Sequence, residues 1–169
     1  MIIWFKGISG VGKSTLGSYF FKFLKKKNKN FIYIDGDTFR KLFNNDIGYS
    51  LRDRNINASR LCNFVKFLQL QRINIVVAAN LTSKKFQVWA KKNYRDYLSI
   101  YIESELSNLK KRDKKKIYKN KKDIVGINIK YDFPKNSDLY IENNLSKKIF
   151  LKNIRLLENL IKKKKIVFD

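Results

Sequence analysis

The sequence contains no histidine, one cysteine and one proline among its 169 residues. Without histidine, neither a histidine general base nor a histidine metal site can be built, so any catalysis depends on other groups. The single cysteine, Cys62, excludes an internal disulfide, which agrees with a reducing compartment. Cys62 also has no histidine to activate it, so we do not expect it to act as a nucleophile.

Acidic residues and long apolar runs are also scarce. The chain carries 38 Lys and Arg against 14 Asp and Glu, a formal net charge of +24. Such a surface attracts polyanions, but the lysines are scattered on both flanks of apolar runs, which favours solvated faces and disfavours a nucleic-acid partner. No run approaches the ~20 apolar residues of a membrane-spanning helix. We expect a cytoplasmic protein without membrane contact, formed by a single domain over residues 1–169.

Apolar runs alternate with helical patterns along the chain. The runs predict strands at Ile2–Phe5, Phe31–Ile34, Ile73–Ala79, Leu98–Ile102 and Leu139–Ile141. The patterns predict helices at Lys13–Lys27, Thr38–Phe43, Arg54–Leu70, Ser83–Tyr94, Glu105–Arg112 and Ser146–Lys164. This alternation predicts an α/β fold, a three-layer sandwich in which a parallel sheet of about five strands has helices on both faces.

A phosphate-loop motif follows the first predicted strand. Residues Gly7 to Thr15 read G-I-S-G-V-G-K-S-T and match G-x-x-x-x-G-K-[ST]. The residues predicted to bind ATP are Gly7, Ser9, Gly10, Gly12, Lys13, Ser14 and Thr15. In such loops backbone N–H groups surround a phosphate, the lysine reaches the β- and γ-phosphates, and the serine hydroxyl ligates Mg²⁺. The sequence therefore predicts an ATP or GTP site, with ATP and Mg²⁺ as the expected ligands.

Two carboxylates, Asp35 and Asp37, follow the second predicted strand. In a parallel sheet this strand end lies near the phosphate loop. One carboxylate can orient or deprotonate an attacking hydroxyl, and the other can hold Mg²⁺ through water. Arg40 lies three residues after Asp37 on the same face of the next helix, where it could clamp a phosphate of the acceptor.

A segment rich in lysine and asparagine, Lys110 to Lys130, shows weak periodicity. We interpret it as a mobile, basic lid over the site, because such lids exclude water during phosphoryl transfer. The alternative is a surface insertion without a function, since long loops are of either kind.

Together these motifs resemble those of the adenylylsulfate kinase (APS kinase) family. That family combines G-L-S-G-x-G-K-S-T with D-G-D-N-x-R-x-x-L-N-x-D-L-G-F-S and D-R-x-x-N-I-R-R. The matching segments here are Gly7–Thr15, Asp35–Ser50 and Asp53–Arg60, with weaker echoes in Arg112–Lys119, Ile124–Asn128 and Tyr131–Pro134. The resemblance covers roughly residues 2 to 142.

The resemblance implies a kinase that moves the γ-phosphoryl group of ATP to the 3′-hydroxyl of a small 5′-nucleotide. Asp37 would then lie at that hydroxyl and, through water, at Mg²⁺, and Asp35 would support the metal's waters. Arg40, Arg54 and Asn57 would hold the 5′ group and the ribose of the acceptor. Tyr49 would stack on its base, and Lys119 would meet phosphate charge. The family also includes dimers, so a homodimer is one option.

The departures from the family pattern gather on the acceptor side. Where the family places two phenylalanines around the base, this chain has Tyr49 and Ile124. The family's I-S-P after the third strand is Leu81-Thr82-Ser83, preceded by the polar Asn80, which could add a hydrogen bond. We therefore expect Asn80, Leu81, Tyr49 and Ile124 to determine the acceptor base.

Several functions stay open on the sequence alone. The preferred one is a kinase for cytidine diphosphoramidate, as in bacterial capsule phosphoramidate synthesis, because a pyrimidine suits a less aromatic pocket. The alternative is an authentic adenylylsulfate kinase that makes 3′-phosphoadenylylsulfate. A polynucleotide kinase or RNA-binding protein would exploit the basic charge, and an inactive nucleotide sensor would not need both Lys13 and Asp37.

Overall fold

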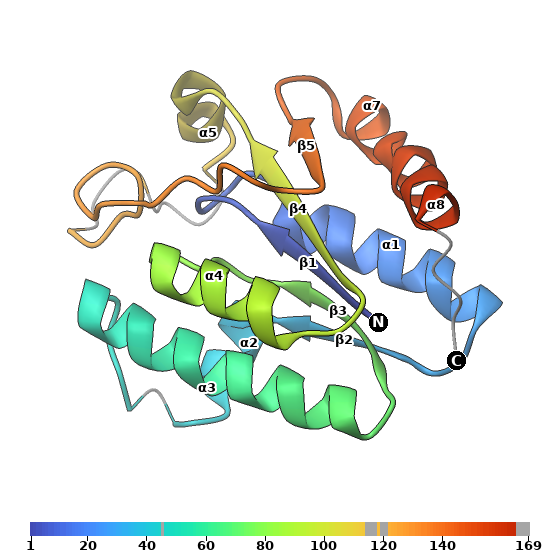
Figure 1. Ribbon diagram of the computed structural model, residues 1–169. Coiled ribbons are helices and arrows are strands. Elements are labelled where there is room, and N and C mark those ends of the chain that lie inside the picture. Colours follow the sequence, from blue (N-terminus) through green and yellow to red (C-terminus); the bar gives the residue numbers. More distant parts are fainter. Residues whose placement is uncertain (45, 114–117, 119–121, 165–169) are drawn as a thin grey trace.

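The computed structural model describes residues 1–44, 46–113, 118 and 122–164, and its centre is a parallel sheet (Figure 1). The strands lie in the order β2, β3, β1, β4, β5 and all pair in parallel. Their bounds are Ile2–Lys6 (β1), Phe31–Asp35 (β2), Asn74–Ala78 (β3), Tyr97–Glu103 (β4) and Leu139–Glu142 (β5). The predicted α/β fold with five parallel strands is confirmed.

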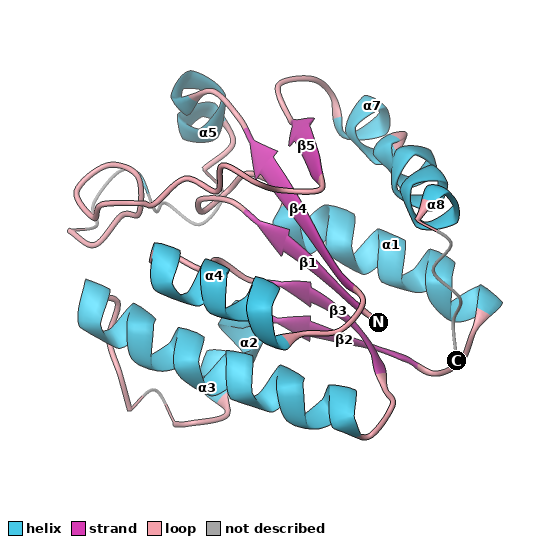
Figure 2. Cartoon of the chain, viewed as in Figure 1, coloured by secondary structure: helices cyan, strands magenta, loops and turns pink. Residues whose placement is uncertain are grey.

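Helices cover both faces of this sheet (Figure 2). Helices α1 (Lys13–Lys27), α7 (Lys147–Leu151) and α8 (Asn153–Lys163) pack on one face, and α3 (Leu51–Leu70) and α4 (Lys84–Asn93) pack on the other. The short helices α2 (Gly36–Lys41) and α5 (Leu106–Lys111) follow the carboxyl ends of β2 and β4. Loops at these strand ends are therefore brought together, as a parallel sheet requires.

The central strand β1 explains why the predicted strands are apolar without alternation. Its Ile3 and Phe5 join the core beneath α1, whereas Ile2 and Trp4 join the core beneath α3 and α4. Successive side chains of a strand point to opposite faces, and here both faces are buried. Strand β1, which is buried on both faces, thus anchors the phosphate loop that follows it.

Two helices begin earlier than the sequence predicts, because polar side chains cap them. Asp35 caps α2 and accepts hydrogen bonds from the backbone N–H groups of Asp37 (3.0 Å) and Thr38 (3.3 Å). Ser50 caps α3 and accepts from the N–H of Asp53 at 3.2 Å. Such caps satisfy donors that have no partner within the helix.

The prediction of one continuous helix over Ser146–Lys164 is wrong. The segment forms α7 and α8, which are separated at Lys152. The side chain of Asn153 donates to the carbonyl of Phe150 at 2.8 Å, and the backbone makes tighter turns from Lys152 to Ile149 and from Arg155 to Lys152. A side-chain amide that competes for a backbone carbonyl is a known cause of helix interruption.

The described part of the predicted lid is anchored to the core. Lys110 and Lys111 belong to α5, and Val125 and Ile129 are buried with Tyr101 and Tyr131. A Cβ at Gly126 would lie 3.2 Å from the Cγ2 of Ile8, so this loop rests against the phosphate loop. Residues 124–129 therefore pack against the core and the phosphate loop, and the role of Lys110–Lys130 as a lid stays a prediction.

Cys62 lies on α3 inside the core and leads to a prediction. Burial raises the pKa of its thiol to about 11, and the side chain is only 2% exposed. We expect the folded protein to react with Ellman's reagent at pH 8 many times more slowly than an exposed thiol, because little thiolate forms. Rapid reaction in guanidinium chloride is the control, and equally rapid reaction of the folded protein would contradict the prediction.

Within the described residues, no helix is both long and apolar enough to cross a membrane.

Candidate active site

The phosphate loop joins the carboxyl end of β1 to the start of α1, and its backbone needs glycine. Gly7 has a φ of 138° and Gly12 a φ of 104°. A Cβ would lie 2.2 Å from the Ile102 carbonyl oxygen at Gly7 and 2.7 Å from Asn143 Nδ2 at Gly12. Neither position accommodates a side chain. Glycine at both positions allows the loop to turn its backbone N–H groups toward a bound phosphate.

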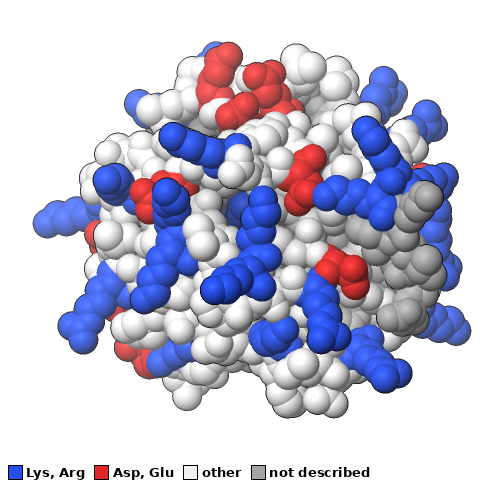
Figure 3. All heavy atoms as spheres, viewed as in Figure 1, with Lys and Arg blue, Asp and Glu red and all other residues white. Residues whose placement is uncertain are grey.

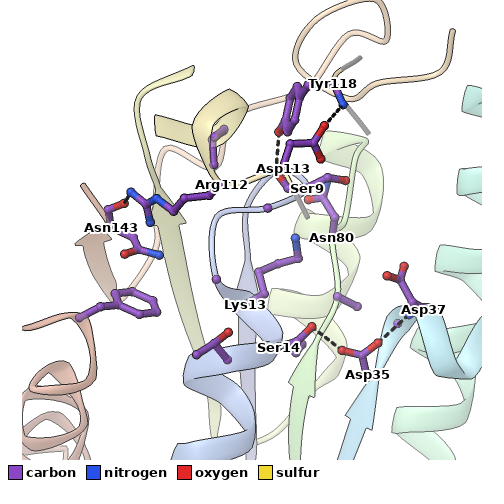
Figure 4. A pocket seen from close by; sticks show the side chains of 18 of the residues that line it. Ser9, Lys13, Ser14, Asp35, Asp37, Asn80, Arg112, Asp113, Tyr118 and Asn143 are labelled. Carbon is purple, nitrogen blue, oxygen red and sulfur yellow. Dashed lines mark hydrogen bonds between the residues drawn. The ribbon is translucent and has the colours of Figure 1, made fainter. Parts of the chain in front are cut away.

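The remaining loop residues face one large cavity. Ser9, Gly10, Gly12, Lys13, Ser14 and Thr15 line a cavity of about 880 Å³, and Gly7 is buried behind them. Lys13 extends into the loop, where its ammonium group donates to the carbonyl of Ile8 at 2.8 Å (Figure 4). The first turn of α1 contains no acidic residue, so the positive end of its dipole is unopposed there.

Ser14 and the two carboxylates meet at one side of this cavity. The Ser14 hydroxyl donates to Asp35 Oδ2 at 2.5 Å, and Asp35 Oδ1 accepts from the N–H of Asp37 (Figure 4). Burial, followed by the charge of Asp35, raises the pKa of the nearby Tyr33 phenol, which stays protonated. Asp37 is exposed and lines the cavity, as predicted for a group that meets an acceptor hydroxyl.

These oxygen atoms fit Mg²⁺ of the kind that kinases use. Among the described residues, no cluster of three or more His, Cys, Asp or Glu could hold a metal ion alone. Mg²⁺ usually keeps several waters and is held by one or two protein oxygens together with substrate phosphates. Ser14 and, through water, Asp35 and Asp37 would hold it, and it would neutralise phosphate charge.

Two arginine side chains lie beside the Tyr49 ring in the wall of the cavity. Arg40 Cζ lies 4.7 Å and Arg54 Cζ 5.5 Å from the centre of the Tyr49 ring. Arg40 donates to the carbonyl of Gly48, and Arg54 donates to the carbonyls of Tyr49 (2.9 Å) and Asp123 (2.8 Å). All three predicted residues line the cavity, so an anionic group and an aromatic base would both find partners here.

Two carboxamides also line this cavity. Among the described residues, the buried Oδ1 atoms of Asn57 and Asn80 have no hydrogen-bond partner. An unsatisfied buried acceptor costs free energy, so a ligand with N–H donors would be stabilised here.

Leu81, which the sequence placed in the acceptor site, is fully buried in the core beneath α3 and α4 and does not line the cavity. The backbone is extended after β3, so Asn80 and Thr82 face the cavity while Leu81 points away. A contact of Leu81 with substrate is therefore not supported by this arrangement.

Ile124, the other residue expected beside the acceptor base, does not line the cavity either. Its N–H donates to Asn128 Oδ1 at 2.6 Å, and its carbonyl accepts from the N–H groups of Ile127, Asn128 and Ile129. This tight turn leaves the Ile124 side chain 5% exposed. Lys119, predicted to meet phosphate charge, lies outside the described residues.

The sequence did not predict one wall of the cavity. Arg112 donates to the carbonyl of Asn143 at 2.6 Å, and Asn143 Nδ2 donates to the carbonyl of Val11 at 2.8 Å. Phe150 and Leu145 complete this wall. Asn143 follows β5, and the rule that ligands bind at the carboxyl ends of parallel strands could have indicated it.

Tyr118 covers the phosphate loop from the side of the predicted lid. Its hydroxyl donates to the carbonyl of Ser9 at 2.5 Å, and its N–H donates to Asp113 Oδ2 at 2.6 Å (Figure 4). The cavity thus has the phosphate loop between Arg112 and Asn143 on one side and Asp35 and Asp37 on the other (Figure 4). This is the layout of a site for two ligands that meet at a phosphate.

Comparison with known proteins identifies the family of this chain. A family model described as adenylylsulphate kinase matches residues 1–142. The cytidine diphosphoramidate kinase of Campylobacter jejuni is 34% identical over 159 residues, which cover 89% of this chain and 92% of that protein. The adenylyl-sulfate kinase of Buchnera aphidicola from Acyrthosiphon pisum is 31% identical over 174 residues, which cover 94% of this chain and 81% of that protein.

A solved structure is also similar over nearly its whole length. The Mycobacterium tuberculosis APS kinase, solved in complex with AMPPNP and APS, superposes with a TM-score of 0.81 and 26% identity. The match covers 95% of this chain and 96% of that chain. The chain therefore belongs to the adenylylsulphate kinase family of phosphate-loop kinases.

Proposed function

We propose that this chain transfers the γ-phosphoryl group of ATP to the 3′-hydroxyl of a 5′-nucleotide whose base carries an exocyclic amine, with cytidine diphosphoramidate as the preferred acceptor. The observation that carries the proposal is the unsatisfied oxygen of Asn80, which lines the same cavity as Tyr49, Arg40 and Arg54. Membership of the family supports ATP as the donor, with Mg²⁺ as its counterion.

The transfer step can be written with the residues at the centre of the cavity. The acceptor oxygen forms a bond to the γ-phosphorus, and the bond from that phosphorus to the β,γ-bridging oxygen breaks, so ADP leaves. The hydroxyl proton passes to the carboxylate of Asp37 and then to solvent. Lys13 and the N–H groups of the loop hold the phosphates in place, since phosphoryl transfer depends on positioning and positive charge.

Arg40 and Arg54 are placed to hold the 5′ end of the acceptor. Both line the cavity, and the guanidinium of each also borders the Tyr49 ring. A guanidinium can donate two parallel hydrogen bonds to a phosphate. The tetrahedral groups of cytidine diphosphoramidate and of adenylylsulfate would both meet this pair, so the arginines do not discriminate between the two acceptors.

Discrimination would come from the base. Cytosine and adenine each present an exocyclic amine that can donate to the Asn80 oxygen, whereas uracil presents a carbonyl there. Tyr49, which is 50% exposed, supplies an aromatic face, but Ile124 does not line the cavity. Since each stacked base gains about 1–3 kcal/mol, a purine loses more than a pyrimidine when the second face is missing. These features favour cytosine.

Adenylylsulfate is the alternative acceptor, and the matching family model and the M. tuberculosis structure favour it. A polynucleotide acceptor is less favoured. On the face shown in Figure 3, lysine and arginine side chains are spread over the whole surface, and several of them lie beside carboxylates. The Asp35–Ser50 segment, which matches the family that acts on small nucleotides, is not needed in this form for polynucleotide binding.

The test is release of ADP with Mg-ATP and four acceptors: cytidine diphosphoramidate, adenylylsulfate, a uridine analogue and an oligonucleotide. We expect the highest kcat/KM with the cytidine compound, and phosphate at the 3′ position of the product by ³¹P NMR. Turnover with adenylylsulfate alone would reject the cytidine assignment but retain the kinase. Turnover with the oligonucleotide alone would reject both assignments.

The Asn80 contact yields a separate prediction. Asn80→Ala should raise KM for the preferred acceptor by roughly three- to tenfold, since one hydrogen bond contributes about 0.5–1.5 kcal/mol. It should also reduce the preference for cytidine over uridine acceptors, which a purely structural effect would leave intact. The matched control is Asn63→Ala, which removes an exposed carboxamide on α3. An unchanged cytidine-to-uridine ratio would contradict the assigned role.

A further inference from the structure

A second cavity of about 260 Å³ lies beside the first half of β4, between α4 and the segment that precedes β5. The charged residues that line it are Lys6, Lys91, Asp138 and Lys164. Among the residues that the structure describes, none lines both this cavity and the active site. A water molecule occupies roughly 30 Å³ of liquid, so the space can hold a ligand of several heavy atoms.

Lys6 is the unusual member of this group. It is 3% exposed and lines the cavity, yet within the described part of the chain its ammonium makes no hydrogen bond or ion pair. Burial lowers the pKa of Lys6 to about 8, an effect that Asp138 opposes and Lys91 assists. Lysines are almost never fully buried without a partner, because a desolvated charge is costly.

The carboxylate in the cavity is already engaged by other groups. Asp138 Oδ2 accepts from the N–H of Ser99 at 2.8 Å, and Asp138 Oδ1 pairs with Lys164. The Tyr97 hydroxyl does not reach into the cavity, because its oxygen has almost no accessible surface. The cavity therefore offers the positive charge of Lys6 and Lys91, which its carboxylate does not neutralise.

We propose that this cavity binds a small tetrahedral oxyanion of the sulfate and phosphate class, held by the ammonium groups of Lys6 and Lys91. Such an anion supplies several acceptor oxygens and a negatively charged partner for the ammonium group of Lys6. Lys6 directly precedes Gly7, the first residue of the phosphate loop. One residue of the proposed site is therefore the direct sequence neighbour of the phosphate loop, although the two cavities are separate.

The first test measures sulfate binding by isothermal titration calorimetry, at an ionic strength held constant with sodium chloride. Lys13→Ala serves as the background, because it weakens anion binding at the phosphate loop. We expect that variant to retain a sulfate site and the double variant with Lys6→Met to bind at least tenfold more weakly. The matched control combines Lys13→Ala with Lys26→Ala, which removes an exposed lysine of α1. Equal binding by all three proteins, or no binding by any, would overturn the proposal.

Thermal unfolding supplies a second readout in the otherwise unmodified chain. Without sulfate, Lys6→Met should unfold at the same temperature as the wild type or higher, because it removes a buried unpaired charge. Sulfate should raise the Tm of the wild type clearly more than that of Lys6→Met. If Lys6→Met fails to fold, the exposed Lys91→Ala provides the same comparison. An equal rise in variant and wild type would show general salt stabilisation and refute the site.

Proton uptake separates this site from any lysine on the surface. An anion beside Lys6 should raise its pKa, so sulfate binding at pH 8 should take up protons, and sulfate itself does not titrate there. The other titratable residues that line the cavity with Lys6 are Lys91, Tyr94, Tyr97, Asp138 and Lys164. Calorimetry in two buffers of different ionisation enthalpy measures the uptake. Identical uptake by Lys6→Met and the wild type would contradict the proposed contact.

Discussion

Lys13→Ala is expected to lower kcat/KM by roughly a thousandfold, since one preorganised charged group facing a developing charge contributes about 10²–10³ in kcat and the lysine also binds the ground-state phosphates. The ammonium of Lys13 lies in the phosphate loop and donates to the carbonyl of Ile8 at 2.8 Å. Alanine removes the positive charge from the place where the β- and γ-phosphates would lie. Steady-state ADP release measures the loss.

The controls for Lys13 separate charge from folding. Lys26→Ala removes an exposed lysine from the same helix and should keep kcat/KM within twofold of the wild type. Lys13→Arg keeps the charge but not the compact shape of the ammonium, so we expect partial loss. Circular dichroism should show that Lys13→Ala is folded. Turnover near the wild-type rate in a folded Lys13→Ala protein would remove the assignment of the phosphate loop.

Asp37→Asn is expected to lower kcat by about 10²–10⁴, the usual contribution of a general base. Asp37 is exposed and lines the cavity at the start of α2, where the N–H of the same residue is fixed by Asp35. Asparagine preserves the shape and this backbone contact but cannot accept the proton of the acceptor hydroxyl. Single-turnover kinetics with saturating ATP should report the slower chemical step.

Binding measurements complete the test of Asp37. The Kd for ATP should change little, because the phosphate loop holds the nucleotide. The matched control is Asp96→Asn, an exposed carboxylate in the turn before β4 whose φ of 45° suits asparagine. We expect that control to retain wild-type kcat. A folded Asp37→Asn protein with unchanged kcat would show that another group receives the proton.

The local motifs of this protein could be predicted because their chemistry lies within a few neighbouring residues. The loop from Gly7 to Thr15 contains its own turn glycines, cation and hydroxyl, and α1 begins and ends where its pattern predicts. The five strands were recognisable because each is an apolar run bounded by polar residues. The break between α7 and α8 escaped prediction, since it depends on one side-chain amide that competes for the carbonyl of Phe150.

The acceptor side was predicted only in part. Arg40, Tyr49 and Arg54 line the cavity as expected, whereas Leu81 and Ile124 do not. A motif specifies which residue type occupies a position, but the side to which its side chain points depends on the register of the extended chain and on local turns. For Ile124 that turn is closed by Asn128.

By itself, the sequence determined the fold class, the phosphate loop and the pair Asp35 and Asp37, because each follows from residues close together in the chain. Tertiary structure alone decided which groups Asn143 contacts and that Lys6 is buried. Asn143 reaches the carbonyl of Val11 across 132 positions, and Lys6 meets Tyr97, Asp138 and Lys164 around a single cavity. Contacts at such separation depend on how the strands are ordered in the sheet, and no local pattern records that order.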